Sequence, residues 1–230
     1  MEIKKYGKID MNWESWNDQM YNLHPTPYYG LSGIIESKRV RTILKMAKIN
    51  ANDSVLEIGC ESGHLLASIK RAKRVVGLDI SKNALNDAAE LLKEKQAYKL
   101  ELLQADAQQE LPFSQGEFNV IICSETLEHV EKPVLVLENI YKISTFNTKV
   151  ILSIPLERPK LFIKNSLRST GLFKLFFKGI EYEQSQWHLH AFSKTYLKNI
   201  CREMFKIKKG KTAWAVHYIV CLQKLYSEAS

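Results

Sequence analysis

The stretch Val55-Leu56-Glu57-Ile58-Gly59-Cys60-Glu61-Ser62-Gly63-His64 decides the fold. The short apolar run at residues 54–58 predicts a buried strand, and the two glycines after it predict a sharp turn that leads into a helix. Gly59 and Gly63 let the backbone turn tightly and let a ligand approach it closely. Because open α/β sheets bind ligands at the carboxyl ends of their strands, we expect a ligand site at this turn.

Short apolar runs alternate with helical patterns on both sides of the turn. A helix through Leu65, Leu66 and Ile69 follows the glycines. Further strands are predicted at residues 74–78, 100–103, 118–123, 149–154, 205–208 and 217–222, and further helices at residues 37–48, 84–95, 134–143 and 194–204. This rhythm, with strands apolar on both faces, predicts an α/β fold in which helices cover both faces of a mostly parallel sheet.

Length and composition fit one globular domain. The chain has 230 residues, of which 45% are hydrophobic and 25% charged, and this excludes disordered and collagen-like classes. No apolar run approaches the roughly 20 residues of a membrane span, and residues 1–6 lead into no secretory signal. The four cysteines are scattered without metal-binding spacing. We expect reduced thiols and a cytoplasmic protein.

The positive charge is concentrated in one segment. Lys and Arg exceed Asp and Glu by 33 to 25, which gives a net charge of +8. Residues 157–211 contain 13 basic and four acidic side chains, a balance of +9, so the rest of the chain sums to −1. An anionic partner, if there is one, should therefore meet this segment.

An acid after the second strand indicates the class of ligand. Asp79 stands at a position from which a carboxylate can bind both hydroxyls of a ribose. Glu57 and Glu61 bracket the glycine turn, where they would repel a pyrophosphate but attract an ammonium or a sulfonium. No G-K-[ST] follows the glycines, so a P-loop is excluded. These features favour a nucleoside with a cationic tail, and S-adenosylmethionine fits that description.

From residue 54 to residue 155 the chain resembles the class I S-adenosylmethionine-dependent methyltransferases. Their first motif, acid-x-G-x-G-x-G, matches Glu57, Gly59 and Gly63, with Glu61 in place of the middle glycine. Later motifs are matched at residues 103–107, 111–113 and 118–121, with Asn119 in place of the usual aspartate. The resemblance implies a Rossmann-like, doubly wound, seven-stranded sheet whose last strand is antiparallel.

The resemblance also implies the roles of individual residues. Glu57 would bind the amino end of the methionine moiety, Asp79 the ribose hydroxyls, Asp106 the adenine amino group and Ala107 the adenine ring. The expected cofactor-binding set is completed by Gly59, Cys60, Gly63, Ile80 and Ser124. In this arrangement residues 49–156 form the cofactor-binding core, residues 1–48 a helical lid, residues 157–192 a basic amphipathic insertion and residues 193–230 the closing helix and strands of a single domain.

Ser124-Glu125-Thr126-Leu127-Glu128-His129 follows the fourth strand at the same edge of the sheet. A helix here would place Glu125, Glu128 and His129 on one face. In one interpretation His129 is the general base for an acceptor hydroxyl. In another, these three side chains bind a divalent metal. In the third, Ser124 caps the helix and the glutamates favour its N-terminal dipole.

The E-x-x-E-H pattern resembles that of ubiquinone-biosynthesis O-methyltransferases and of small-RNA 2′-O-methyltransferases, in which it ligates metal. His188, ahead of His190, is the first candidate for an additional ligand or second base. We therefore predict O-methylation of a small, lipid-like acceptor, with catalytic roles for His129, Glu125 and His188. The alternatives are a metal-dependent RNA 2′-O-methyltransferase and a non-catalytic module that binds S-adenosylmethionine.

The basic insertion bears on the partner. Residues 160–180 combine Lys and Arg with Phe and Leu at helical spacing, so they could lie on a membrane surface or simply cap the core. Amphipathicity is normal for a surface helix, which favours the cap. A nucleic-acid partner is not expected, because the sequence contains no recognisable RNA-binding module.

Overall fold

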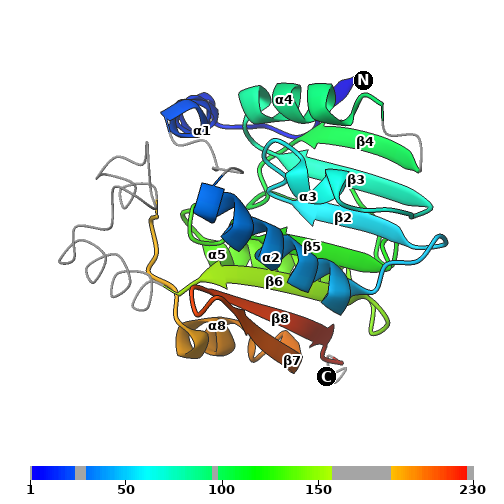
Figure 1. Ribbon diagram of the computed structural model, residues 1–230, viewed down its shortest axis with the longest axis vertical. Helices are drawn as coiled ribbons and strands as arrows, with labels where there is room; N and C mark the ends of the chain where they lie inside the picture. The colour runs from blue at the N-terminus through cyan, green and yellow to red at the C-terminus, as the bar shows by residue number, and fades with distance from the viewer. Residues whose placement is uncertain (1, 24–29, 95–97, 157–187, 227–230) are drawn as a thin grey trace.

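A computed structural model of the protein describes residues 2–23, 30–94, 98–156 and 188–226 (Figure 1). Its centre is an eight-stranded sheet with the order β1-β4-β3-β2-β5-β6-β8-β7. The strands are β1 (Ile3–Lys5), β2 (Ser54–Ile58), β3 (Arg74–Asp79), β4 (Lys99–Gln104), β5 (Val120–Ser124), β6 (Lys149–Pro155), β7 (Phe205–Ala213) and β8 (His217–Lys224). Strand β8 is antiparallel to both of its neighbours, and every other adjacent pair is parallel. The predicted α/β fold is confirmed.

Helices cover both faces of the sheet, as Figure 1 shows. They are α1 (Met11–Leu23), α2 (Gly30–Ala47), α3 (His64–Ala67), α4 (Lys82–Leu92), α5 (Pro133–Ile143) and α8 (Lys194–Cys201). Helices α2, α3 and α4 share one apolar core with the sheet, and α5 and α8 share the other. Within β2, Leu56 and Ile58 enter the α5 side and Val55 the α2 side, all fully buried. This double burial explains why the strand is a continuous apolar run.

All seven strands expected from the sequence are present, and β1 is an additional one. It pairs with the edge strand β4, where Ile3 lies opposite Leu102. The pairing continues when the backbone N–H of Tyr6 donates to the carbonyl of Gln104 at 2.9 Å. Strand β1 is only three residues long and contains two exposed lysines, so it has no apolar run by which to recognise it.

Helix bounds differ modestly from the expected ones. Helix α2 begins at Gly30, seven residues before the expected start at residue 37, and α8 ends at Cys201, before the expected end at residue 204. Helix α3 is a single turn that ends before Ile69. Of the described helices, none has both the length and the apolar character that crossing a bilayer requires.

The sheet order creates the position of the site. Strand β2 pairs with β3 on one side and with β5 on the other, so the chain reverses its direction of progress across the sheet at β2. The carboxyl ends of these three strands and of β4 meet at one edge. A crevice at such a reversal point is where open α/β sheets bind their ligands.

Candidate active site

The glycine turn between β2 and α3 uses left-handed backbone conformations. Gly59 and Gly63 have φ angles of 72° and 78°, and Glu61 between them has a φ of 48°. Glu61 therefore adopts the conformation that glycine favours, although it carries a side chain. Its backbone N–H donates to Asp79 Oδ2 at 2.8 Å, which ties the turn to the end of β3. The turn is therefore left-handed at Gly59, Glu61 and Gly63 alike.

Close packing explains why the two outer positions are glycine. A Cβ atom at Gly59 would lie 2.2 Å from Thr126 Oγ1, and one at Gly63 would lie 2.9 Å from Leu92 Cδ1. Cys60, between them, is 4% exposed and its N–H donates to the carbonyl of Leu78 at 3.0 Å. Burial raises the pKa of the Cys60 thiol well above its usual range, which disfavours the reactive thiolate.

Asp79 is held rigidly at the end of β3. Besides accepting from Glu61, it accepts from the backbone N–H of Ser81 through Oδ1 at 2.9 Å. Desolvation raises the pKa of Asp79, and hydrogen bonds from backbone N–H groups, including that of Ile80, partly offset this. The carbonyl of Ile80 accepts from Gln104 Nε2 at 3.1 Å, which joins β3 to β4. A fixed carboxylate of this kind is suited to a pair of ribose hydroxyls.

Glu57 is a buried acid of this edge with a carboxylate oxygen that no described residue satisfies. Its side chain is 3% exposed, and its Oε2 has no hydrogen-bond partner among the described residues. Burial raises the pKa of Glu57 well above its usual range, although the nearby Arg39 guanidinium lowers it. A buried carboxylate oxygen without a partner is costly, so Glu57 is suited to receive a cationic group.

The loop after β4 completes the cofactor edge. The backbone N–H of Ala105 donates to the carbonyl of Asp79 at 3.0 Å and so places the next two residues beside β3. Asp106 and Ala107 are each 8% exposed. Asp106 Oδ1 accepts from the N–H of Gln108 at 2.9 Å, and the carbonyl of Ala107 accepts from the Asn139 amide at 3.0 Å. The structure therefore brings the expected cofactor-binding residues to one edge.

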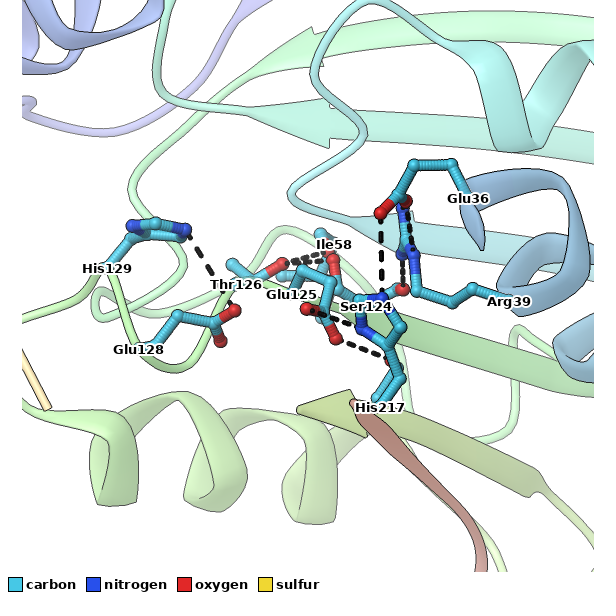
Figure 2. Close-up of polar contacts among 10 residues, drawn as sticks. Glu36, Arg39, Ile58, Ser124, Glu125, Thr126, Glu128, His129 and His217 are labelled. Atoms are coloured by element: carbon cyan, nitrogen blue, oxygen red, sulfur yellow. Dashed lines mark hydrogen bonds and ion pairs between the residues drawn. The ribbon is translucent and has the colours of Figure 1, made fainter. Parts of the chain in front are cut away.

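The segment after β5 is a turn, so the helix that would have placed Glu125, Glu128 and His129 on one face does not form. Glu125 has a φ of 53°, a left-handed conformation that sends its side chain away from Glu128 and His129. Figure 2 shows Glu125 directed toward His217 of β8. Its two carboxylate oxygens accept from His217 Nδ1 at 3.0 Å and from Ser153 Oγ at 2.6 Å. The left-handed backbone conformation of Glu125 thus directs its side chain away from that of Glu128.

Glu125 belongs to a buried polar network that sequence reasoning missed. Arg39, which is 6% exposed, donates to Ser124 Oγ and to Glu36 Oε2, and Glu36 Oε1 lies 3.6 Å from His217 Nε2. Burial alone would raise the pKa of Glu125, but His217 and then Arg39 reverse this and lower it strongly. The signal in the sequence was Arg39 itself, because it shares a helical face with the buried Ile43 and Met46.

Glu128, His129 and His188 come together instead. A ligand atom from each lies within 4.8 Å of the other two, and His129 Nε2 lies 3.9 Å from Glu128 Oε1. The rings of His129 and His188 meet edge to face with their centroids 4.9 Å apart. The N–H of Leu189 donates to the carbonyl of Glu128 at 2.8 Å, which brings the distant His188 to the turn.

The remaining sequence candidates have other positions. His190 Nε2 is hydrogen-bonded to the carbonyls of Val130 and Glu131 at 3.0 and 3.1 Å, so His190 is part of the scaffold. The basic insertion at residues 160–180 lies outside the described residues, as do residues 24–29 of the expected lid. Helix α1 of that lid is anchored to α4, where Asp18 accepts from Ser81 Oγ at 2.5 Å and Tyr21 donates to Asp87 at 2.6 Å.

The fold and this edge define an α/β protein that binds an adenosine ligand with a cationic tail. Residues 49–209 match a family described as a methyltransferase domain. The chain therefore belongs to the class I S-adenosylmethionine-dependent methyltransferases, and S-adenosylmethionine is its cofactor.

The chain is also similar to individual proteins. It is 29% identical over 179 residues to a ubiquinone biosynthesis O-methyltransferase of Aliivibrio fischeri (strain MJ11). This match covers 77% of this chain and 72% of that protein. It is 28% identical over 171 residues to a demethylmenaquinone methyltransferase of Lactococcus lactis, and this match covers 70% of this chain and 65% of that protein. Among solved structures, the fold is similar to the crystal structure of the N-methyltransferase NodS from Bradyrhizobium japonicum in complex with S-adenosylhomocysteine. The superposition has a TM-score of 0.60 at 17% sequence identity and covers 94% of this chain and 96% of NodS.

Proposed function

We propose that this enzyme methylates a hydroxyl oxygen of a small, quinone-precursor-like acceptor. The observation that carries the proposal is the Glu128–His129–His188 cluster beside the cofactor edge, because a hydroxyl acceptor has a proton to lose and these groups can take it. The similarity to enzymes named for ubiquinone biosynthesis and to a demethylmenaquinone methyltransferase supports this class of acceptor.

The proposed binding of the cofactor uses complementary charges. The methionine moiety carries an ammonium and a carboxylate, and the edge offers Glu57 and the neighbouring Arg39, whose charges influence each other. We assign Glu57 to the ammonium and Arg39 to the carboxylate. Asp79 would receive the ribose hydroxyls, and Asp106 the adenine amino group.

In the proposed mechanism His129 acts as the general base. The acceptor oxygen forms a bond to the methyl carbon while the carbon–sulfur bond breaks and leaves its electron pair on sulfur. The hydroxyl proton passes to His129, and the carboxylate of Glu128, 3.9 Å away, stabilises the resulting imidazolium. Because the sulfonium is already an activated donor, alignment of donor and acceptor supplies much of the rate.

A divalent metal is the second candidate for this position. Two imidazoles and one carboxylate are a suitable ligand set, so Glu128, His129 and His188 fit a metal, whereas Glu125 is committed to His217 and Ser153. Such an ion would supply Lewis-acid polarisation of the acceptor oxygen.

The test compares His129→Ala with the scaffold variant His190→Ala. We expect the first to keep its affinity for S-adenosylmethionine in calorimetry and to lose roughly 100-fold or more in turnover. The second should keep both, after correction for stability. Turnover of His129→Ala within a few-fold of wild type would refute the base. Activity that chelator removes and added metal restores would select the metal instead, and cofactor binding without transfer to any hydroxyl would favour the non-catalytic alternative.

A further inference from the structure

Helix α2 has an apolar inner side and a basic outer side. Val40, Ile43 and Ala47 point into the core and are at most 7% exposed. Positions three or four residues apart share a helix face, and on the outer face these positions carry Lys38, Arg41 and Lys45, followed by Lys48 directly after the helix. All four cations are exposed.

Strand β7 carries a second row of cations on the same side of the sheet. Lys209 and Lys211 lie opposite Cys221 and Ile219, whose side chains belong to the core beneath α2. Lys206 and Lys208 are exposed as well, the latter at the irregularity between residues 207 and 209. Strand β7 is the edge of the sheet, so none of the other strands in the described part of the chain covers it.

The two rows are neighbours and form one positive surface. Helix α2 packs against β6, β8 and β7, and Figure 1 shows it in front of the sheet at β6. None of the eight cations forms an ion pair with another described residue, and the one acid of the two elements, Glu36, faces inward to Arg39. We call this surface the α2–β7 basic surface; it consists of Lys38, Arg41, Lys45, Lys48, Lys206, Lys208, Lys209 and Lys211.

Two exposed apolar side chains lie at one end of this surface. Ile34, on the outer face of α2, is 56% exposed, and Trp214, in the turn between β7 and β8, is 54% exposed. Glu36, two residues after Ile34 on α2, has its Oε1 3.6 Å from His217 Nε2. Ala213, next to Trp214 in the chain, pairs with His217 across the hairpin. This end is therefore the carboxyl edge of the sheet, where the active site lies.

The turn that presents Trp214 is unusual. Trp214 and Ala215 are two of the three residues that join Ala213 to its partner His217, and their φ angles of 51° and 58° lie in the left-handed region that glycine and asparagine favour. A tryptophan that is held in solvent at such a position indicates a role at an interface rather than in folding.

We propose that the α2–β7 basic surface, with Ile34 and Trp214 at its end, docks on an anionic phospholipid bilayer. Lysines attract the acidic headgroups, and an aromatic and an aliphatic side chain enter the headgroup region. Edge lysines also prevent strand-to-strand aggregation, but this explains neither the cations of α2 nor Trp214. An RNA would match the charge and could stack a base on Trp214, but it offers no apolar phase for Ile34. If the proposed function holds, docking brings the mouth of the active site to a membrane-dissolved acceptor, but vesicle binding itself requires no catalysis.

The experiment is sedimentation of the full chain, without cofactor, with phosphatidylcholine vesicles that contain or lack phosphatidylglycerol. The charge variant is Lys38→Gln/Arg41→Gln/Lys208→Gln/Lys211→Gln. Its matched control removes four exposed cations elsewhere, as Lys70→Gln/Arg71→Gln/Lys73→Gln/Lys82→Gln. The apolar variant is Ile34→Ala/Trp214→Ala, and its control is Leu91→Ala on α4, where Leu91 is 43% exposed.

We expect binding only to the anionic vesicles, weaker at high salt. The charge variant should lose roughly tenfold or more in partitioning and its control less than threefold, since neighbouring cations act together at a charged surface. The apolar variant should lose several-fold, and Leu91→Ala should lose nothing. Equal losses in the charge variant and its control, an unchanged apolar variant, or binding of an RNA oligonucleotide but not of vesicles would each overturn the proposal. Binding of S-adenosylmethionine, measured separately, tests the proposed function.

Discussion

Replacing Glu57 with glutamine tests whether the unpartnered buried carboxylate serves the cofactor. The glutamine side chain would have nearly the same shape but no charge, so it would lose the charge-assisted hydrogen bond to the ammonium of the methionine moiety. Such a bond contributes about 1.5–3 kcal/mol, so the dissociation constant for S-adenosylmethionine should rise by roughly 10- to 150-fold. Calorimetric titration at pH 8 measures it directly.

The same variant should make the protein without cofactor more stable. Because burial raises the pKa of Glu57, the folded chain retains this proton to a higher pH than the unfolded chain does. Stability is therefore lost as the pH rises above the ordinary carboxyl value of 4.5, and Glu57→Gln should escape this loss. We expect a gain of about 1–3 kcal/mol at pH 8 that disappears near pH 4.5.

Urea unfolding at several pH values and calorimetry at pH 8 are sufficient for this test. The exposed Glu94→Gln is the control and should change neither quantity. The reasoning would be refuted if Glu57→Gln bound S-adenosylmethionine within twofold of wild type, or if its difference in stability were the same at pH 5 and pH 8.

Three further substitutions test the surroundings of this carboxylate. Gly59→Ala should cost about 2–4 kcal/mol of stability in urea unfolding, because its Cβ would meet Thr126 Oγ1 at 2.2 Å at a positive φ; adding Thr126→Ala should recover part of the loss, and no recovery would contradict the clash. Glu125→Gln should destabilise the chain by about 3 kcal/mol at pH 7 and less at pH 4, because the Glu125 pKa is lowered and its stabilisation is lost as the pH falls below the ordinary value of 4.5; equal losses at both pH values would contradict the pairing with His217. Asp79→Asn should weaken cofactor binding at least tenfold in calorimetry, whereas Asp53→Asn, a buried acid at the opposite edge of the sheet, should not; equal effects would argue against a specific site.

The fold and the cofactor edge could be predicted because their signals are local. Buried parallel strands leave continuous apolar runs. Glu57 and Asp79 stand among the last residues of β2 and β3, and Asp106 comes two residues after β4. Strand β1 could not be predicted, because its three residues include two lysines and carry no apolar pattern. Its strand conformation depends on pairing with β4, which is distant in the sequence.

The acceptor side was predicted less well because distant contacts determine it. A single left-handed residue, Glu125, breaks the helix that its spacing with Glu128 and His129 indicated. Its partner His217 is 92 residues away and becomes a neighbour only because β8 inserts beside β6. His188 lies in the cluster with Glu128 and His129. The sequence contained no sign that His188, and not Glu125, would be the third member of that cluster.

The central claim is methyl transfer to oxygen at the His129 side of the cofactor edge. The most direct measurement incubates the enzyme with methyl-labelled S-adenosylmethionine and hydroxylated aromatic acceptors, with and without prenyl tails, and locates the label by mass spectrometry. We predict a labelled methyl ether with the wild type and almost none with His129→Ala, although that variant still binds the cofactor. Label found only on nitrogen or carbon, or equal ether formation by both proteins, would contradict the account.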